Sequence, residues 1–211
     1  MFFQSDYILR MIQMMGDFFR RLAEIVDENE KADEFDELMR KHCAVDLKTV
    51  DALSVDSLIA LLPDNPRFVL SELLYLRAYA FQLHDEDRDE FLYKSFRLLL
   101  SVAHENLLCE LRRDRMMDFY ESINEKMSSQ DLICVFQFLL LADDYDTAED
   151  ILFDAIESAP SCDLKPIVQA GIEGFQRVST FTNRELVLGG LSVEEVTDIL
   201  TELNALLSDE A

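Results

Sequence analysis

The chain has 211 residues, 49% of them hydrophobic, and a formal net charge of −24. The hydrophobic content is too high for a disordered chain, and 5 Gly and 4 Pro are too few for an all-β fold rich in turns. The negative charge disfavours nucleic acid and anionic membranes as partners, because their phosphate groups repel it. We therefore expect a helical protein that binds neither.

Cysteine usage and hydropathy bear on the compartment. The four cysteines, at positions 43, 109, 134 and 162, include no C-x-x-C pair, which is typical of a reduced cytoplasmic protein. The N-terminal phenylalanines are followed at once by Asp6, and no long apolar run is present. We expect a cytoplasmic protein without a signal peptide or a membrane span.

The first part of the chain is predicted to form two long helices and two short ones. Apolar residues recur at helical spacing over Gln4–Asp27 and again over Lys31–Cys43. Short helices are expected at Leu47–Leu53 and Ser54–Leu62. Residues 63–66, which hold two prolines, then make the clearest break in the chain. This break is either a boundary between sub-bundles or a tight turn, and the lack of a Gly/Ser linker favours the turn.

The middle of the chain combines a helical hairpin with the only dense basic cluster. Helices are expected at Phe68–Leu83 and Phe91–Ala103, and His104–Met127 continues as helix. The residues of the basic cluster are Arg112, Arg113 and Arg115. Between Met127 and Leu164 there are nine acidic residues and no basic one. The arginines are candidates to pair with this acidic segment, in the same molecule or in another. An intramolecular or solvent-facing role is the default, and an interface with another molecule is the alternative.

The acidic segment itself predicts a second hairpin. Leu132–Ala142 is strongly apolar and makes a buried helix, and a turn leads to Asp144, whose carboxylate can cap the next helix. Ala148 and Ala155 leave room for a neighbouring helix to approach closely. Pro160 cannot continue the hydrogen-bond ladder, so the second helix ends there.

This hairpin resembles one tetratricopeptide repeat, a unit of about 34 residues. The positions that match are Tyr145, Ala148, Leu152, Ala155 and Pro160, with Leu132 and Leu139 acceptable in the first helix. Phe136 is a departure, because the family usually has a small residue there. The resemblance implies a right-handed stack of paired helices, with a concave groove suited to an extended peptide or a helix.

The resemblance also implies which residues line that groove. They are Gln130, Ile133, Gln137, Leu140 and Leu141. Relatives that grip C-terminal carboxylates carry basic and amide residues where this chain has Ile133 and Gln137, so that ligand is disfavoured. Plain core positions are the alternative for the three apolar residues of the set.

The C-terminal part is predicted to hold further helices with well-marked ends. Asp163–Val178 is helical, and Gly171 and Gly174 inside it indicate a close helix crossing. Thr182–Glu185 and Ser192–Glu195 have the spacing of capping boxes. A Gly pair between the two boxes ends a short helix, and the second box starts the last helix.

The opening of the chain carries a second resemblance. Residues 4–12, Gln-Ser-Asp-Tyr-Ile-Leu-Arg-Met-Ile, are similar to the start of an uncharacterised family of small helical proteins. That family occurs mainly in Firmicutes and has repeats similar to tetratricopeptides, and it implies no particular activity. Tyr7 and Arg10 are candidates for partner contacts, and the alternative is that this helix seals the end of a bundle.

The chain offers no recognisable catalytic, cofactor or metal motif. His104-Glu105 begins like a zinc-peptidase motif, but Leu108 stands where the second histidine must be. Neither glycine-rich phosphate-binding pattern is present. Cys43 follows His42, but adjacent residues on a helix point in different directions. We therefore predict no catalytic residues, no cofactor and no metal.

Together these patterns predict an all-α protein, an irregular right-handed stack of tetratricopeptide-like hairpins that spans residues 1–211 as one domain. The expected function is a non-catalytic protein-interaction module. Its partner would be a basic or amphipathic segment, or a second copy of the chain. The alternatives are an enzyme with an unrecognised site and an acidic decoy for a nucleic-acid-binding protein.

Overall fold

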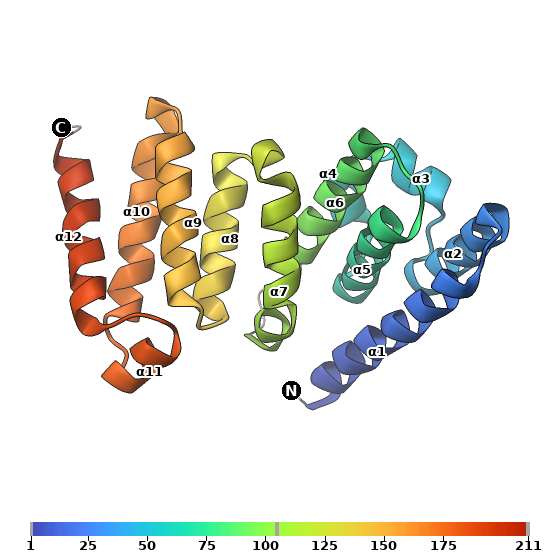
Figure 1. Ribbon diagram of the computed structural model, residues 1–211, viewed down its shortest axis with the longest axis horizontal. Coiled ribbons are helices and arrows are strands. Elements are labelled where there is room, and N and C mark those ends of the chain that lie inside the picture. Colours follow the sequence, from blue (N-terminus) through green and yellow to red (C-terminus); the bar gives the residue numbers. More distant parts are fainter. Residues whose placement is uncertain (1, 104–105, 210–211) are drawn as a thin grey trace. The chain divides into compact units, whose positions relative to one another are not determined.

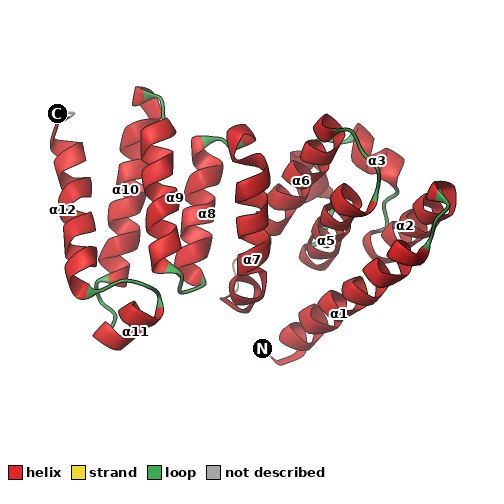
Figure 2. Cartoon of the chain, viewed as in Figure 1, coloured by secondary structure: helices red, strands yellow, loops and turns green. Residues whose placement is uncertain are grey.

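The computed structural model describes residues 2–103 and 106–209, and all regular structure in these ranges is helical (Figure 2). The all-α prediction is confirmed.

The chain divides into two compact units. The first unit is Met1–Leu108 with Met117–Asn124, and the second is Cys109–Met116 with Glu125–Ala211. Residues 63–66 therefore lie inside the first unit. No helix in the described ranges is long and apolar enough to cross a membrane.

In the part of the first unit that the structure describes, there are the six N-terminal helices and both ends of the seventh (Figure 1). Their bounds are α1 Phe2–Glu24, α2 Glu28–Cys43, α3 Leu47–Ala52, α4 Val55–Leu61, α5 Asp64–Ala80, α6 Asp85–Leu100 and α7 Asn106–Ile123. The predicted helices are all present. The two prolines at the predicted break make only a tight turn, because Pro63 precedes α5 and Pro66 occupies its first turn, where a missing N–H costs nothing.

The predicted hairpin of α5 and α6 forms the centre of the first unit, and this is its most extensive helix pair. Ser71 and Ser95 face each other inside it, and both are buried. The Ser71 hydroxyl donates to the Ser95 carbonyl at 2.7 Å, and the Ser95 hydroxyl donates to the Ser71 carbonyl at 2.6 Å. Two small residues let the helices approach closely, and the reciprocal bonds leave neither hydroxyl unsatisfied.

Two buried lysines form hydrogen bonds between this hairpin and neighbouring helices. Lys31 Nζ of α2 donates to the carbonyl of Ala80, at the end of α5, at 3.3 Å. Lys94 Nζ of α6 donates to the carbonyl of Val50, near the end of α3, at 3.0 Å. An ammonium group at a helix C-terminus meets unpaired carbonyls and the negative end of the helix dipole. Each lysine therefore satisfies groups that burial would otherwise leave without a partner.

Within its described residues, the second unit follows a short 3-10 turn with five helices. Their bounds are Asn124–Lys126 for the turn, then α8 Ser129–Leu141, α9 Tyr145–Ser158, α10 Ser161–Val178, α11 Asn183–Leu188 and α12 Val193–Asp209. The predicted hairpin is present as α8 and α9, and α9 ends before Pro160 as expected. α10 packs against α8, α9 and α12, so it occupies the middle of this unit.

Two glycines explain how α10 packs so closely, which confirms the predicted crossing. A Cβ atom on Gly171 would lie 2.6 Å from Leu152 Cδ2 of α9. A Cβ atom on Gly174 would lie 2.6 Å from Phe136 Cζ of α8. Phe136 is fully buried, with its ring centroid 5.8 Å from that of Phe175. Gly174 thus makes room for the bulky residue that departs from the tetratricopeptide pattern.

The predicted cap at the start of α9 is wrong in its chemistry. Asp144 does occupy the capping position, but its carboxylate accepts a hydrogen bond from the Thr147 hydroxyl at 3.0 Å and none from the backbone N–H groups of the first turn. The backbone N–H groups of Tyr145 and Asp146 donate instead to the carbonyl of Gly189, at 2.9 and 3.2 Å. The Asp144 carboxylate forms an ion pair with Arg113 of α7. This pair confirms the intramolecular interpretation for one of the three clustered arginines.

Both predicted capping boxes are present in the second unit. The N–H of Thr182 donates to Glu185 Oε2 at 2.8 Å, and the N–H of Ser192 donates to Glu195 Oε2 at 2.7 Å. In each box the hydroxyl accepts from the glutamate N–H in return. These hydrogen bonds hold the pKa of both carboxyl groups below the usual range, because they favour the ionised form.

Candidate functional site

The predicted groove residues on α8 divide into exposed and buried ones. Gln130 and Gln137 are exposed, whereas Ile133 is only 7% exposed and belongs to the core. Leu140 and Leu141 are half-buried, and Leu140 lies against α10. The core alternative therefore describes Ile133. Peptide binding along this side of α8 stays a prediction.

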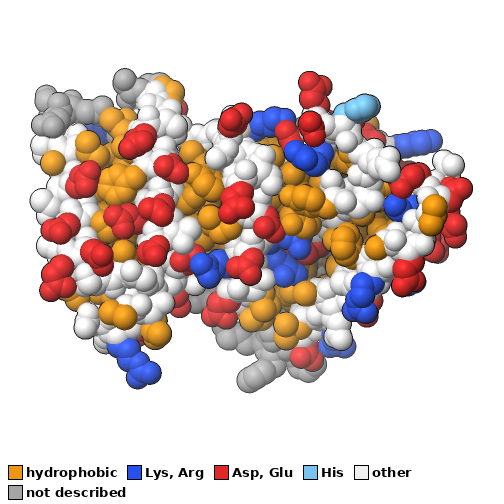
Figure 3. Space-filling view, viewed as in Figure 1, with side chains coloured by type: hydrophobic (Ala, Val, Ile, Leu, Met, Phe, Trp, Pro, Cys, Tyr) orange, Lys and Arg blue, Asp and Glu red, His pale blue; other side chains and the backbone are white. Residues whose placement is uncertain are grey.

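A different surface of the second unit concentrates charge of one sign. Neither α9 nor α12 contains a lysine or an arginine. Figure 3 shows Asp and Glu side chains spread around hydrophobic ones over these two helices. We call the following set of carboxylates the acidic face: Asp146, Glu149, Asp150, Glu195 and Glu202.

The spacing of these residues places carboxylates and apolar side chains on shared helix faces. On α9, Glu149 lies one turn before Phe153 and two turns before Ile156, and all three are half-buried. On α12, Glu195 and Glu202 are two turns apart, and both are exposed. The acidic face is therefore amphipathic, with apolar side chains among the carboxylates.

The pKa of Glu149 reflects negative charge on both helices. Its pKa is raised above the ordinary value, first by partial burial and then by the negative charges of Asp150, Glu195, Asp146 and Glu202. None of these five carboxylates forms an ion pair with another residue in the described ranges. Negative charges on two helices thus act on Glu149 without a neutralising cation, which is an arrangement that a cationic partner would relieve.

Nucleophilic and metal chemistry find little support in the part of the chain that the structure describes. Burial raises the pKa of the Cys43 thiol to about 12 and, with the help of a neighbouring carboxylate, that of Cys109 to about 11. Both thiols are protonated at neutral pH, whereas a nucleophilic cysteine acts as the thiolate. No three His, Cys, Asp or Glu side chains there could hold a metal ion. His104 and Glu105 lie outside the described residues.

The two N-terminal residues singled out from the sequence differ in exposure. Arg10 is exposed and forms an ion pair with Asp6 at 3.4 Å, one turn earlier on α1. Tyr7 is half-buried, and this burial raises the pKa of its hydroxyl. A partner contact through either residue stays a prediction.

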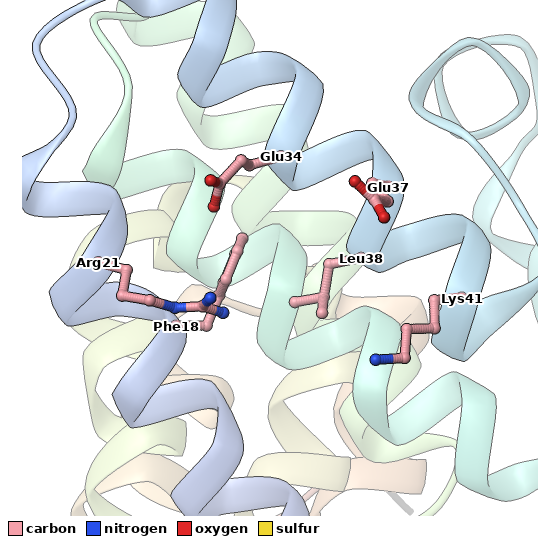
Figure 4. A pocket seen from close by; sticks show the side chains of 6 residues that line it. All are labelled: Phe18, Arg21, Glu34, Glu37, Leu38 and Lys41. Atoms are coloured by element: carbon pink, nitrogen blue, oxygen red, sulfur yellow. The ribbon is translucent and has the colours of Figure 1, made fainter.

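A pocket of about 230 Å³ lies between α1 and α2, with Phe18 in its wall. Figure 4 shows Arg21 and Lys41 extending from opposite sides toward Leu38, with Glu34 and Glu37 at another edge. Charges of both signs line this small pocket, and it contains no nucleophile or general base beside its two carboxylates. It therefore does not select one class of ligand as clearly as the acidic face does.

The chain belongs to a family of unknown function, DUF6483, whose model matches residues 2–208. Membership of an uncharacterised family is thus confirmed, and tetratricopeptide-like repeats stay a prediction. No curated protein and no solved structure matches the chain.

Proposed function

We propose that this member of the DUF6483 family is a non-catalytic protein-interaction module whose acidic face binds a basic amphipathic segment of a partner protein. The observation that carries the proposal is the cluster around Glu149, whose pKa is raised first by partial burial and then by carboxylates of α9 and α12, without a neutralising cation. Lysine or arginine side chains of a partner would replace this repulsion by attraction. Phe153 and Ile156 would accept the apolar side of the same segment.

Ion pairs and apolar contacts are expected to contribute differently to the free energy of binding. An exposed ion pair contributes about 0.2–1 kcal/mol, so three such pairs contribute about 0.6–3 kcal/mol. Burial of apolar surface adds about 25 cal/mol per Å². The carboxylates would therefore mainly provide fast association and selection of basic partners, and the apolar side chains would provide much of the affinity.

The same charges bear on self-association. Two copies of the acidic face would bring like charges together, which disfavours a dimer through this surface. A partner of opposite charge is the better fit, and a homo-oligomer would have to use another surface.

We further propose that α8, α9 and α10 form a tetratricopeptide-like unit within an irregular right-handed stack. The close hairpin of α8 and α9 supports this proposal, because Ala148 and Ala155 are buried within it. The packing of α10 on both helices also supports it. The exposed side of α8, with Gln130 and Gln137, would then be a second surface for a peptide.

The binding experiment titrates the protein with a fluorescent, helical peptide that carries lysines on one face and leucines on the other. The test variant combines Glu149→Gln, Glu195→Gln and Glu202→Gln. Glutamine keeps the shape of each side chain and also serves in a capping box, so α12 keeps its start. We expect the variant to bind about tenfold more weakly or worse, because it loses about 1.4 kcal/mol or more of ion pairing.

The matched control removes the same charge from the first unit. It combines Glu24→Gln, Glu86→Gln and Glu121→Gln, three exposed positions. The control is expected to bind nearly as well as the wild type. Equal loss in both variants would mean that only net charge matters, and would refute a defined binding face.

A further inference from the structure

The first unit contains a cavity that does not involve the acidic face. It lies among α3, α5, α6 and the connection between the last two, and its volume is about 340 Å³. Sites for small ligands typically have volumes of about 300–1,000 Å³. The residues that line it are Asp51, Arg77, Leu83, Asp87, Glu90 and Phe91.

Arg77 lies among three aromatic rings and forms no short ion pair, although the charges of Asp51, Asp36 and Asp87 act on its guanidinium. Its guanidinium carbon lies 4.7, 5.0 and 5.7 Å from the ring centroids of Phe81, Phe91 and Phe35. Its Nε and Nη1 are buried without a hydrogen-bond acceptor. Arg77 forms no ion pair with any residue in the described part of the chain. Such a group favours an added anion, because an arginine stays charged even when it is partly buried.

Two carboxylates of the same cavity are not held in an ion pair. Asp51 and Asp87 form no ion pair within the described ranges, whereas Glu90 pairs with Lys94 at 2.8 Å. Burial raises the pKa of Asp51, Arg77 and Lys94 act against this, and Glu90 and Asp87 add to it. Arg77 therefore offsets only part of the effect of burial on Asp51, and the two side chains form no ion pair in the cavity that both line.

We propose that this cavity binds a free basic amino acid, a ligand class that carries one carboxylate and two cationic groups. The ligand carboxylate would pair with Arg77, and its two cationic groups would pair with Asp51 and Asp87. Its methylene chain would lie against Leu83 and Phe91. These charges match one to one, whereas a neutral amino acid would leave one carboxylate unpaired and a simple anion would face both carboxylates. The site goes beyond the protein-binding function and does not depend on it.

Isothermal titration calorimetry of the full chain tests the proposal with L-lysine and L-arginine as probes. Cadaverine, which is lysine without its carboxylate, serves as the comparison ligand. We expect saturable binding of at least one amino acid and about tenfold weaker binding of cadaverine, because cadaverine cannot pair with Arg77. The variants Asp51→Asn and Asp87→Asn should each weaken amino acid binding by about tenfold. Both positions are exposed, so we expect these variants to fold.

The control variant is Glu86→Gln, an exposed residue in the first turn of α6 that does not line the cavity. It should bind like the wild type. Three results would each overturn the proposal: no saturable heat at ligand concentrations up to about 10 mM, equal affinity for cadaverine, or equal weakening by Glu86→Gln and Asp51→Asn. None of these outcomes depends on whether the acidic face binds a protein.

Discussion

At the scale of single residues, Gly189 connects two distant parts of the second unit. Its carbonyl accepts the N–H groups that start α9, and its Cα has the ring of Tyr145 directly beside it. A Cβ atom there would also lie 2.8 Å from the carbonyl oxygen of Asp143. Glycine is therefore required at this position because of a close approach between backbones.

The substitution Gly189→Ala should lower the free energy of unfolding by about 1–3 kcal/mol, because the added methyl group overpacks this contact. Urea denaturation followed by circular dichroism measures the change. The matched control is Gly16→Ala in α1, where an added Cβ would meet nothing within 4 Å. It should raise stability by about 0.5–1 kcal/mol, as alanine does in a helix interior. An unchanged stability for Gly189→Ala would contradict the account of this contact.

Local signals made several ends of helices predictable from the sequence. Thr182, Ser192 and Pro160 act within about one turn of their own helix, so four neighbouring residues contain the information. The cap of α9 was not predictable in this way. It depends on Gly189, which comes from a loop more than forty positions along the chain and reaches α9 only in the folded protein.

For the candidate site too, some features could be predicted from neighbouring residues and others depend on the folded chain. The acidic run between Met127 and Leu164 is visible in the sequence, and so are the carboxylates of the last helix. These carboxylates come together because α9 and α12 both pack on α10. The spacing of residues along the sequence does not predict this packing. The cluster of rings around Arg77 was missed for the same reason, because the rings come from α2, α6 and the connection after α5.

At the scale of elements, the fit of Phe136 to Gly174 couples α8 to α10. Gly174→Ala should lower the free energy of unfolding by about 1–3 kcal/mol, because its Cβ would lie 2.6 Å from the Phe136 ring. In a Phe136→Leu background the same substitution should cost less, because the shorter side chain leaves room. The expected coupling is about 1 kcal/mol in a double-mutant cycle measured by urea denaturation. Additive effects would show that the two positions do not share this contact.

Burial of Glu149 and the carboxylates around it give stability a pH dependence of known sign. The pKa of Glu149 is raised in the folded state, so the folded protein holds this proton more tightly than the unfolded chain does. Ionised Glu149 therefore lowers stability at neutral pH, and this effect disappears as the pH falls below 4.5, the ordinary value. Glu149→Gln should raise the melting temperature at neutral pH, with a gain that shrinks on acidification.

The control for this prediction is Glu157→Gln, which removes an exposed charge from the end of the same helix. Its effect on the melting temperature should be smaller than that of Glu149→Gln at neutral pH. Calorimetry of both variants over a range of pH makes the comparison. The same gain from both would assign the effect to net charge and not to the cluster.

At the scale of the whole molecule, the net charge of −24 opposes the folded state through self-repulsion. Salt shortens the Debye length from about 30 Å at 0.01 M to about 8 Å at 0.15 M, so it screens this repulsion. The melting temperature should therefore rise over this range, and equally with NaCl and KCl. A fall with added salt would mean that attractive ion pairs outweigh the repulsion.

The central claim is that the acidic face binds a basic partner. The most direct test captures proteins from an extract of the source cells with the wild type and with the Glu149→Gln, Glu195→Gln, Glu202→Gln variant, at low and at high salt. We predict one stoichiometric protein that the wild type retains at low salt only, that the variant does not retain, and that crosslinks to α9 or α12 through a basic segment. A partner retained equally by the variant, or crosslinked to another surface, would contradict the claim.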